Sequence, residues 1–183
     1  MLIVDRLKQG YLLFSKLSFD TVFGVYCSLL FCSSFFKVDL PLILVVGILV
    51  GTWGLYSVDR LLDNLQFDDT QFSFRHLFYD QQKKWLLICL VLADLILVGV
   101  FFMVDMKIRI LGGCLGVAFF VHHLFLRFKW YGFFKPVVTS LIYTSAIFGP
   151  YFILGEISLE RIAIYCGFMV ICFLNLVLGE VSE

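Results

Sequence analysis

The sequence predicts an all-α, polytopic membrane protein with about six transmembrane helices. Of its 183 residues, 61% are hydrophobic and 15% are charged, whereas soluble domains average about 45–50% apolar and 25% charged residues. The mean hydropathy is +0.98. Six apolar segments are long enough to cross a bilayer as helices. These observations exclude a soluble globule, and we expect a single membrane domain over residues 1–183.

The predicted spans follow one another along the whole chain. Each is an apolar segment bounded by charged or turn residues, and the six cover 19–36, 40–58, 85–104, 108–125, 134–154 and 159–178. Residues 1–18 mix charged and apolar positions, without the basic start, apolar middle and cleavage site of a signal peptide. We therefore expect an interfacial lead-in that lies on the membrane surface before the first span.

Lys and Arg are distributed unequally between the two sides of the membrane. Ten lie on the side of the N-terminus: Arg6, Lys8, Lys16, Arg60, Arg75, Lys83, Lys84, Arg127, Lys129 and Lys135. Four lie on the opposite side: Lys37, Lys107, Arg109 and Arg161. By the positive-inside rule the N-terminus, the long charged loop 59–84, the loop 127–135 and the C-terminal end are cytoplasmic, and we expect the bacterial inner membrane. The net charge of zero gives no reason to expect nucleic acid as a partner.

A first pair of acidic residues stands where the second span reaches the cytoplasmic side. Asp59 and Asp63 are four residues apart in the run Tyr-Ser-Val-Asp-Arg-Leu-Leu-Asp-Asn over 56–64, so they share one face if the helix continues. Two carboxylates so placed repel unless a cation lies between them. Mg²⁺ prefers such oxygen ligands together with substrate phosphates. The alternative is an ordinary solvated helix end, in which Arg60 neutralises its neighbours.

A second acidic pair stands where the sixth span reaches the same side. Glu180 and Glu183 are three residues apart. Asn175 lies about 140° around an ideal helix from Glu180 and joins the pair only if Gly179 loosens the turn. Together, the two acidic pairs suit a site that clamps a diphosphate through bridging metal ions, with basic residues of the cytoplasmic loops contacting its oxygens. The alternative for the second pair is a polar chain end.

These motifs resemble the UbiA superfamily of intramembrane prenyltransferases. The resemblance covers about residues 20 to 183 and rests on a Y-x-x-D-R-x-L-D run over 56–63, the segment 75–79, Lys135-Pro136, and Asn175 with the two glutamates. It implies Mg²⁺-dependent transfer of a prenyl group from an isoprenyl diphosphate to an unknown acceptor within the membrane.

The resemblance also implies a role for each candidate residue. Asp59 and Asp63 would be catalytic, and Arg60, Arg75 and Lys135 would bind the substrate diphosphate. The residues that would hold Mg²⁺ are Asp59, Asp63, Asn175, Glu180 and Glu183.

The chain departs from the family's usual pattern in three ways. Leu55 and Tyr56 occupy the positions of the customary Asn and Asp in the first motif, and the second motif has glutamates where the family has aspartates. Family members usually have about nine spans, so we expect a truncated product or a fragment. The alternative function is that of a non-catalytic membrane helix bundle that binds a partner or lipid.

Some polar residues fall inside the predicted spans. Asp94 lies in the middle of the third span, where we expect it to face protein or a wet cavity, or to be protonated. Tyr143 on the fifth span, with Thr139 one turn before it and Ser140 and Thr144 beside it, forms a polar strip. It could face a substrate cavity, but hydrogen bonding between helices is the favoured interpretation.

Overall fold

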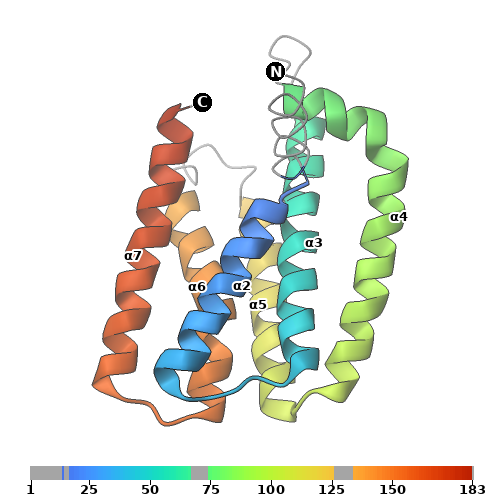
Figure 1. Ribbon diagram of the computed structural model, residues 1–183. Coiled ribbons are helices and arrows are strands. Elements are labelled where there is room, and N and C mark those ends of the chain that lie inside the picture. The colour runs from blue at the N-terminus through green and yellow to red at the C-terminus, as the bar shows by residue number, and fades with distance from the viewer. Residues whose placement is uncertain (1–13, 15–16, 67–73, 126–133, 183) are drawn as a thin grey trace, which may run out of the picture. The chain divides into compact units, whose positions relative to one another are not determined.

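The computed structural model describes residue 14 and residues 17–66, 74–125 and 134–182. All secondary-structure elements in this part of the chain are α-helices (Figure 1). The helices are α2 (Phe19–Phe36), α3 (Leu42–Gln66), α4 (Phe74–Met103), α5 (Met106–Phe125), α6 (Lys135–Leu154) and α7 (Leu159–Ser182). Each contains a segment long and apolar enough to cross a membrane, so the all-α class and the six candidate spans are confirmed.

The helix boundaries differ from the predicted spans mainly around the charged segment 59–84. The first span matches α2 at both ends, but α3 continues to Gln66 and α4 already begins at Phe74. Most of the expected loop is therefore helical. The physical reason is that Leu, Gln, Lys and Arg all have good helix propensity, so a helix does not have to end where its apolar segment meets water.

The chain divides into two compact units, and α2 contributes one half to each. The first unit comprises residues 1–28 and 41–103, and the second comprises residues 29–40 and 104–183. Helices α3 and α4 lie side by side in the first unit (Figure 1). Gly47 and Gly51 of α3 allow this close approach, because they leave room for Val100 and Leu97 of α4.

The second unit is built around α6, which packs against both α5 and α7. Ile147, Phe148 and Tyr151 of α6 are almost completely buried. The ring of Phe148 contacts the rings of Phe36 on α2 and Phe168 on α7, with ring centroids 5.9 Å and 5.3 Å apart. Aromatic packing of this kind holds the second half of α2 and α7 against α6.

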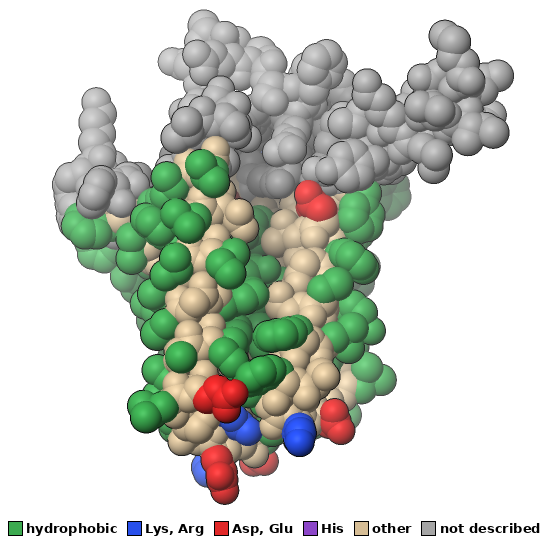
Figure 2. Space-filling model, turned by 60° about the vertical axis from the view of Figure 1, so that its left-hand side comes forward, with side chains coloured by type: hydrophobic (Ala, Val, Ile, Leu, Met, Phe, Trp, Pro, Cys, Tyr) green, Lys and Arg blue, Asp and Glu red, His purple; other side chains and the backbone are tan. Residues whose placement is uncertain are grey.

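Large apolar side chains cover the outer surfaces of the helices. Trp85 and Phe102 on α4 are 68% and 69% exposed, and Leu178 on α7 is 65% exposed. On the face shown in Figure 2, hydrophobic side chains line the helices and most of the visible charged side chains gather near one end. Because so much exposed apolar surface is unfavourable in water but not in lipid, this surface supports an integral, multi-pass membrane protein.

Candidate functional site

The first acidic pair lies on one uninterrupted helix. Because α3 runs without a break through Gln66, Asp59 and Asp63 are separated by about 6 Å along the helix axis and lie on the same face. Asp59 is half-buried, and Arg60 follows it on the same helix. The sequence predicts a shared face for this pair only if the helix continues past the second span, and α3 does continue. Two carboxylates one turn apart are suitable oxygen ligands for Mg²⁺.

Arg75 belongs to the same compact unit as this pair. It is the second residue of α4, which begins at Phe74. The start of α4 and the end of α3 lie at the same end of the first unit (Figure 1). The backbone therefore brings the Asp59–Asp63 pair, Arg60 and Arg75 to one region. A metal–diphosphate complex requires carboxylates for the metal ion and cations for the diphosphate, and this region has both.

The second group of candidates belongs to the second unit. Asn175 is exposed on α7, Glu180 lies in the last two turns of that helix, and Glu183 lies outside the described residues. Lys135 is the first residue of α6 and is half-buried. Helix α7 stays regular across Gly179 and ends at Ser182, so Asn175 remains about 140° around the helix from Glu180. The loosened turn that would join them is not found.

The two acidic pairs are thus placed in separate units. The convergence of Asp63 with Glu180 on one ligand stays a prediction. Among the described residues, no group of three or more His, Cys, Asp or Glu side chains could by itself hold a metal ion. Each pair alone offers two carboxylates, which fits Mg²⁺ only if phosphate oxygens and water complete its coordination.

The polar residues of α6 make contacts between and within helices. The hydroxyl of Thr139 lies 3.2 Å from Nε2 of the buried His122 on α5. The ring of Tyr143 is stacked on the ring of Phe168 of α7, with centroids 6.4 Å apart and planes at 4°. Ser140 donates to the carbonyl oxygen of Val137 in its own helix. The interpretation of this strip as a source of hydrogen bonds between helices is therefore confirmed for Thr139.

Asp94 lies in the apolar part of α4, and its side chain is exposed. The expectation that it faces protein or a wet cavity, or is protonated, stays a prediction. A carboxylate in the middle of a membrane span is costly in hydrocarbon unless a polar group or water meets it.

Sequence reasoning missed one cluster of charged residues in the second unit. Arg161, in the first turn of α7, donates a hydrogen bond to the carbonyl oxygen of Phe36 at the end of α2, at 3.1 Å. Lys37 and Arg161 both line one cavity of the second unit. From the sequence alone, both residues are only positive charges on the side opposite the acidic pairs. Because Lys37 and Arg161 are far apart in the sequence, no local pattern indicates that they form a cluster.

Comparison of the chain with protein-family models, with curated proteins and with solved structures finds no match. Support for a function therefore comes from the residues of this chain alone.

Proposed function

We propose that the chain is a Mg²⁺-dependent intramembrane prenyltransferase of the UbiA type, which transfers a prenyl group from an isoprenyl diphosphate to an acceptor. The observation that carries this proposal is the continuity of α3 through Gln66. It puts Asp59 and Asp63 one helical turn apart, immediately past an apolar segment that can cross a membrane. This is where a diphosphate headgroup would lie if its prenyl tail entered the bilayer.

The order of the spans supports a shared site for the two acidic pairs. A chain changes membrane side with each crossing, so the ends of the second and sixth spans emerge on one side if all six candidate helices cross. Asp59 and Asp63 lie near the polar end of α3, and Glu180 lies near the polar end of α7, with Glu183 three residues later in the sequence. Four carboxylates on one membrane side suit two cations held against one diphosphate.

Each group has a defined role in the proposed reaction. Bound Mg²⁺ would supply Lewis-acid stabilisation of the departing diphosphate. Asp59 and Asp63 would hold it, while Arg60, Arg75 and Lys135 would hydrogen-bond the diphosphate oxygens. The allylic carbon–oxygen bond breaks and the diphosphate leaves with the electron pair. The acceptor then forms a bond to the resulting cation with its own electron pair and loses a proton. The apolar helices would exclude the water that would otherwise quench that cation.

Binding of radiolabelled farnesyl diphosphate to the full chain in lipid nanodiscs tests the proposal. We expect binding that requires Mg²⁺ and is abolished by EDTA. Asp59→Asn and Asp63→Asn should each weaken it about tenfold or more, since each removes a charged metal ligand. Asp39→Asn is the matched control, because Asp39 is exposed and lies between α2 and α3, outside both acidic motifs. Binding that is insensitive to EDTA, or unchanged in both motif variants, would reject the proposal.

The exposure of Asp94 favours a second candidate function, that of a subunit in a larger membrane assembly. A polar side chain of a partner helix would satisfy the carboxyl group within the bilayer. The size of the protein–detergent complex in mild detergent tests this candidate. We expect an oligomer that dissociates in the Asp94→Leu variant and persists in Asp39→Leu. A wild-type monomer, or an oligomer that survives Asp94→Leu, would remove this candidate.

A further inference from the structure

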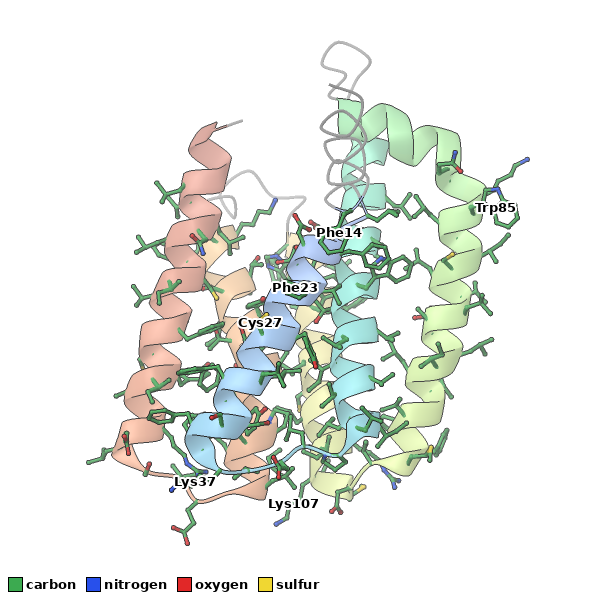
Figure 3. All side chains as sticks on the ribbon, viewed as in Figure 1. Phe14, Phe23, Cys27, Lys37, Trp85 and Lys107 are labelled. Carbon is green, nitrogen blue, oxygen red and sulfur yellow. The ribbon has the colours of Figure 1, made fainter. Side chains whose placement is uncertain are left out.

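A cavity of about 230 Å³ lies in the second unit, where α2 ends and the loop between α6 and α7 turns back. Figure 3 shows Lys37 at this end of α2. The residues around the cavity that matter here are Phe35, Phe36, Lys37, Glu156, Glu160 and Arg161. The cavity therefore combines two cations, two carboxylates and two aromatic rings, and it is separate from the acidic pairs discussed above.

Main-chain and aromatic contacts fix the guanidinium group of Arg161 at this cavity. It donates to the carbonyl oxygens of Phe36, at 3.1 Å, and Tyr151, at 3.5 Å. It also lies 4.9 Å from the centre of the Phe36 ring, within the range of a cation–π interaction. Gly155 makes this position possible, because a Cβ atom there would overlap the guanidinium group. Arg161 is thus held in place by neutral groups, which leave its positive charge uncompensated.

Lys37 supplies the second cation from a backbone position that normally favours glycine. It directly follows the last residue of α2 and has a φ of 52°. Helices commonly end in this left-handed conformation, but with Gly, since a Cβ atom is sterically unfavourable there. A non-glycine residue held in such a conformation is a feature associated with functional sites.

The two carboxylates beside the cavity are not paired with these cations. Glu156 and Glu160 are exposed, and within the described residues neither lies within ion-pair distance of Lys37 or Arg161. Ile157 and Leu159, which lie between them in the sequence, are 70% and 87% exposed. Charged and large apolar side chains close together in the sequence suit the membrane interface, where apolar groups enter the bilayer and charged groups remain in water.

We propose that this cavity binds the phosphoethanolamine headgroup of a membrane phospholipid. Lys37 and Arg161 hydrogen-bond the phosphate, and Glu156 and Glu160 accept hydrogen bonds from the ammonium group. Phe35 is 41% exposed beside them and offers apolar surface to the start of an acyl chain. A lipid is favoured over soluble phosphoethanolamine because the cavity lies at the ends of helices that can span a membrane.

Lipid retention by the purified full chain, measured by native mass spectrometry after exchange into detergent with defined lipid, tests this proposal. We expect phosphatidylethanolamine to bind about tenfold more tightly than phosphatidylcholine, because the choline headgroup has no N–H to donate to the glutamates. Soluble phosphoethanolamine at the same concentration should not displace the lipid. Equal retention of both lipids, or displacement by the soluble compound, would overturn the assignment to a lipid headgroup.

Variants connect the binding to the cavity. Lys37→Gly removes a cation but is compatible with a φ of 52°, so the chain should fold and bind phosphatidylethanolamine about tenfold more weakly. The double variant Glu156→Gln/Glu160→Gln should lose the preference over phosphatidylcholine. Lys107→Gln and Asp105→Asn, at exposed positions near the start of α5, are the matched controls and should bind as the wild type does. Wild-type binding and selectivity in both cavity variants would contradict the proposal.

Discussion

The hydroxyl group of Tyr151 on α6 donates a hydrogen bond to the main-chain carbonyl oxygen of Leu29 on α2, at 2.7 Å. The Tyr151 side chain is fully buried, and the hydroxyl of Ser33 lies 2.9 Å from the same phenolic oxygen. Because the phenol has only one proton, Ser33 is the donor in this second bond. Tyr151 therefore joins the second half of α2 to α6 through one buried and one partly buried hydrogen bond.

Tyr151→Phe should destabilise the fold by about 1 kcal/mol, since it keeps the ring but removes the hydroxyl that bonds Leu29 and Ser33. Tyr151→Ala should cost about 3–5 kcal/mol, because it also leaves a cavity. Unfolding by SDS titration in mixed micelles, followed by circular dichroism, measures both. Tyr26→Phe, at an exposed tyrosine of α2, is the control and should leave the free energy of unfolding unchanged. Equal effects at the two tyrosines would contradict the role of the buried bonds.

The sequence could predict the six spans because the bilayer sets a length and a polarity that composition reveals directly. Residues 19–36 form a mostly apolar segment between Ser18 and Lys37. Helix α2 begins and ends at the same residues as this segment. Hydropathy did not predict the first turns of α4 as part of a span, because they contain several charged residues. The Leu, Gln, Lys and Arg residues there nevertheless have good helix propensity.

The acidic pair and the Arg161 cluster also differ in how far the sequence alone could predict them. The spacing of Asp59 and Asp63 is local, so their shared helical face could be predicted once a helix was assumed. The contact between Arg161 and the carbonyl oxygen of Phe36 joins residues 125 positions apart. Only the packing of α2, α6 and α7 creates that contact, and no spacing rule indicates it.

Gly47 of α3 should be intolerant of a side chain. A Cβ atom there would lie 2.7 Å from Cγ1 of Val100 on α4, closer than carbon atoms normally pack. We expect Gly47→Ala to destabilise the pairing of α3 with α4 by about 1–3 kcal/mol, as overpacking usually does. SDS-induced unfolding measures the loss.

Two further variants separate this steric effect from helix propensity. Gly54→Ala lies on the same helix, and its Cβ atom would have no neighbour within 4 Å, so this variant should be neutral or slightly stabilising. Adding Val100→Ala to Gly47→Ala should recover part of the lost stability, because it removes the clashing methyl group. A Gly54→Ala variant as unstable as Gly47→Ala would show that packing against Val100 is not the cause.

Gly155→Ala should displace the guanidinium group of Arg161. The new Cβ atom would overlap that group and would lie 3.0 Å from the carbonyl oxygen of Tyr151. Losing the bonds to Phe36 and Tyr151 and the cation–π contact should cost about 1–3 kcal/mol of stability. If so, adding Arg161→Ala to Gly155→Ala should cause little further loss. Fully additive effects of the two substitutions would show that Gly155 does not act through Arg161.

The membrane orientation can be tested with cysteines introduced at exposed positions and a membrane-impermeant maleimide applied to intact cells. Lys107→Cys and Ile157→Cys flank α5 and α6, so two crossings place both residues on one side. The excess of Lys and Arg at the other ends of the helices predicts that this side is extracytoplasmic. Both cysteines should therefore be labelled, whereas Gln82→Cys, near the start of the apolar part of α4, should react only after permeabilisation. The wild-type chain with its six native cysteines gives the background.

Labelling of Gln82→Cys alone would reverse the orientation and place the acidic motifs outside the cytoplasm. Labelling of only one of Lys107→Cys and Ile157→Cys would mean that α5 and α6 do not both cross, and the shared membrane side of the two acidic pairs would no longer follow.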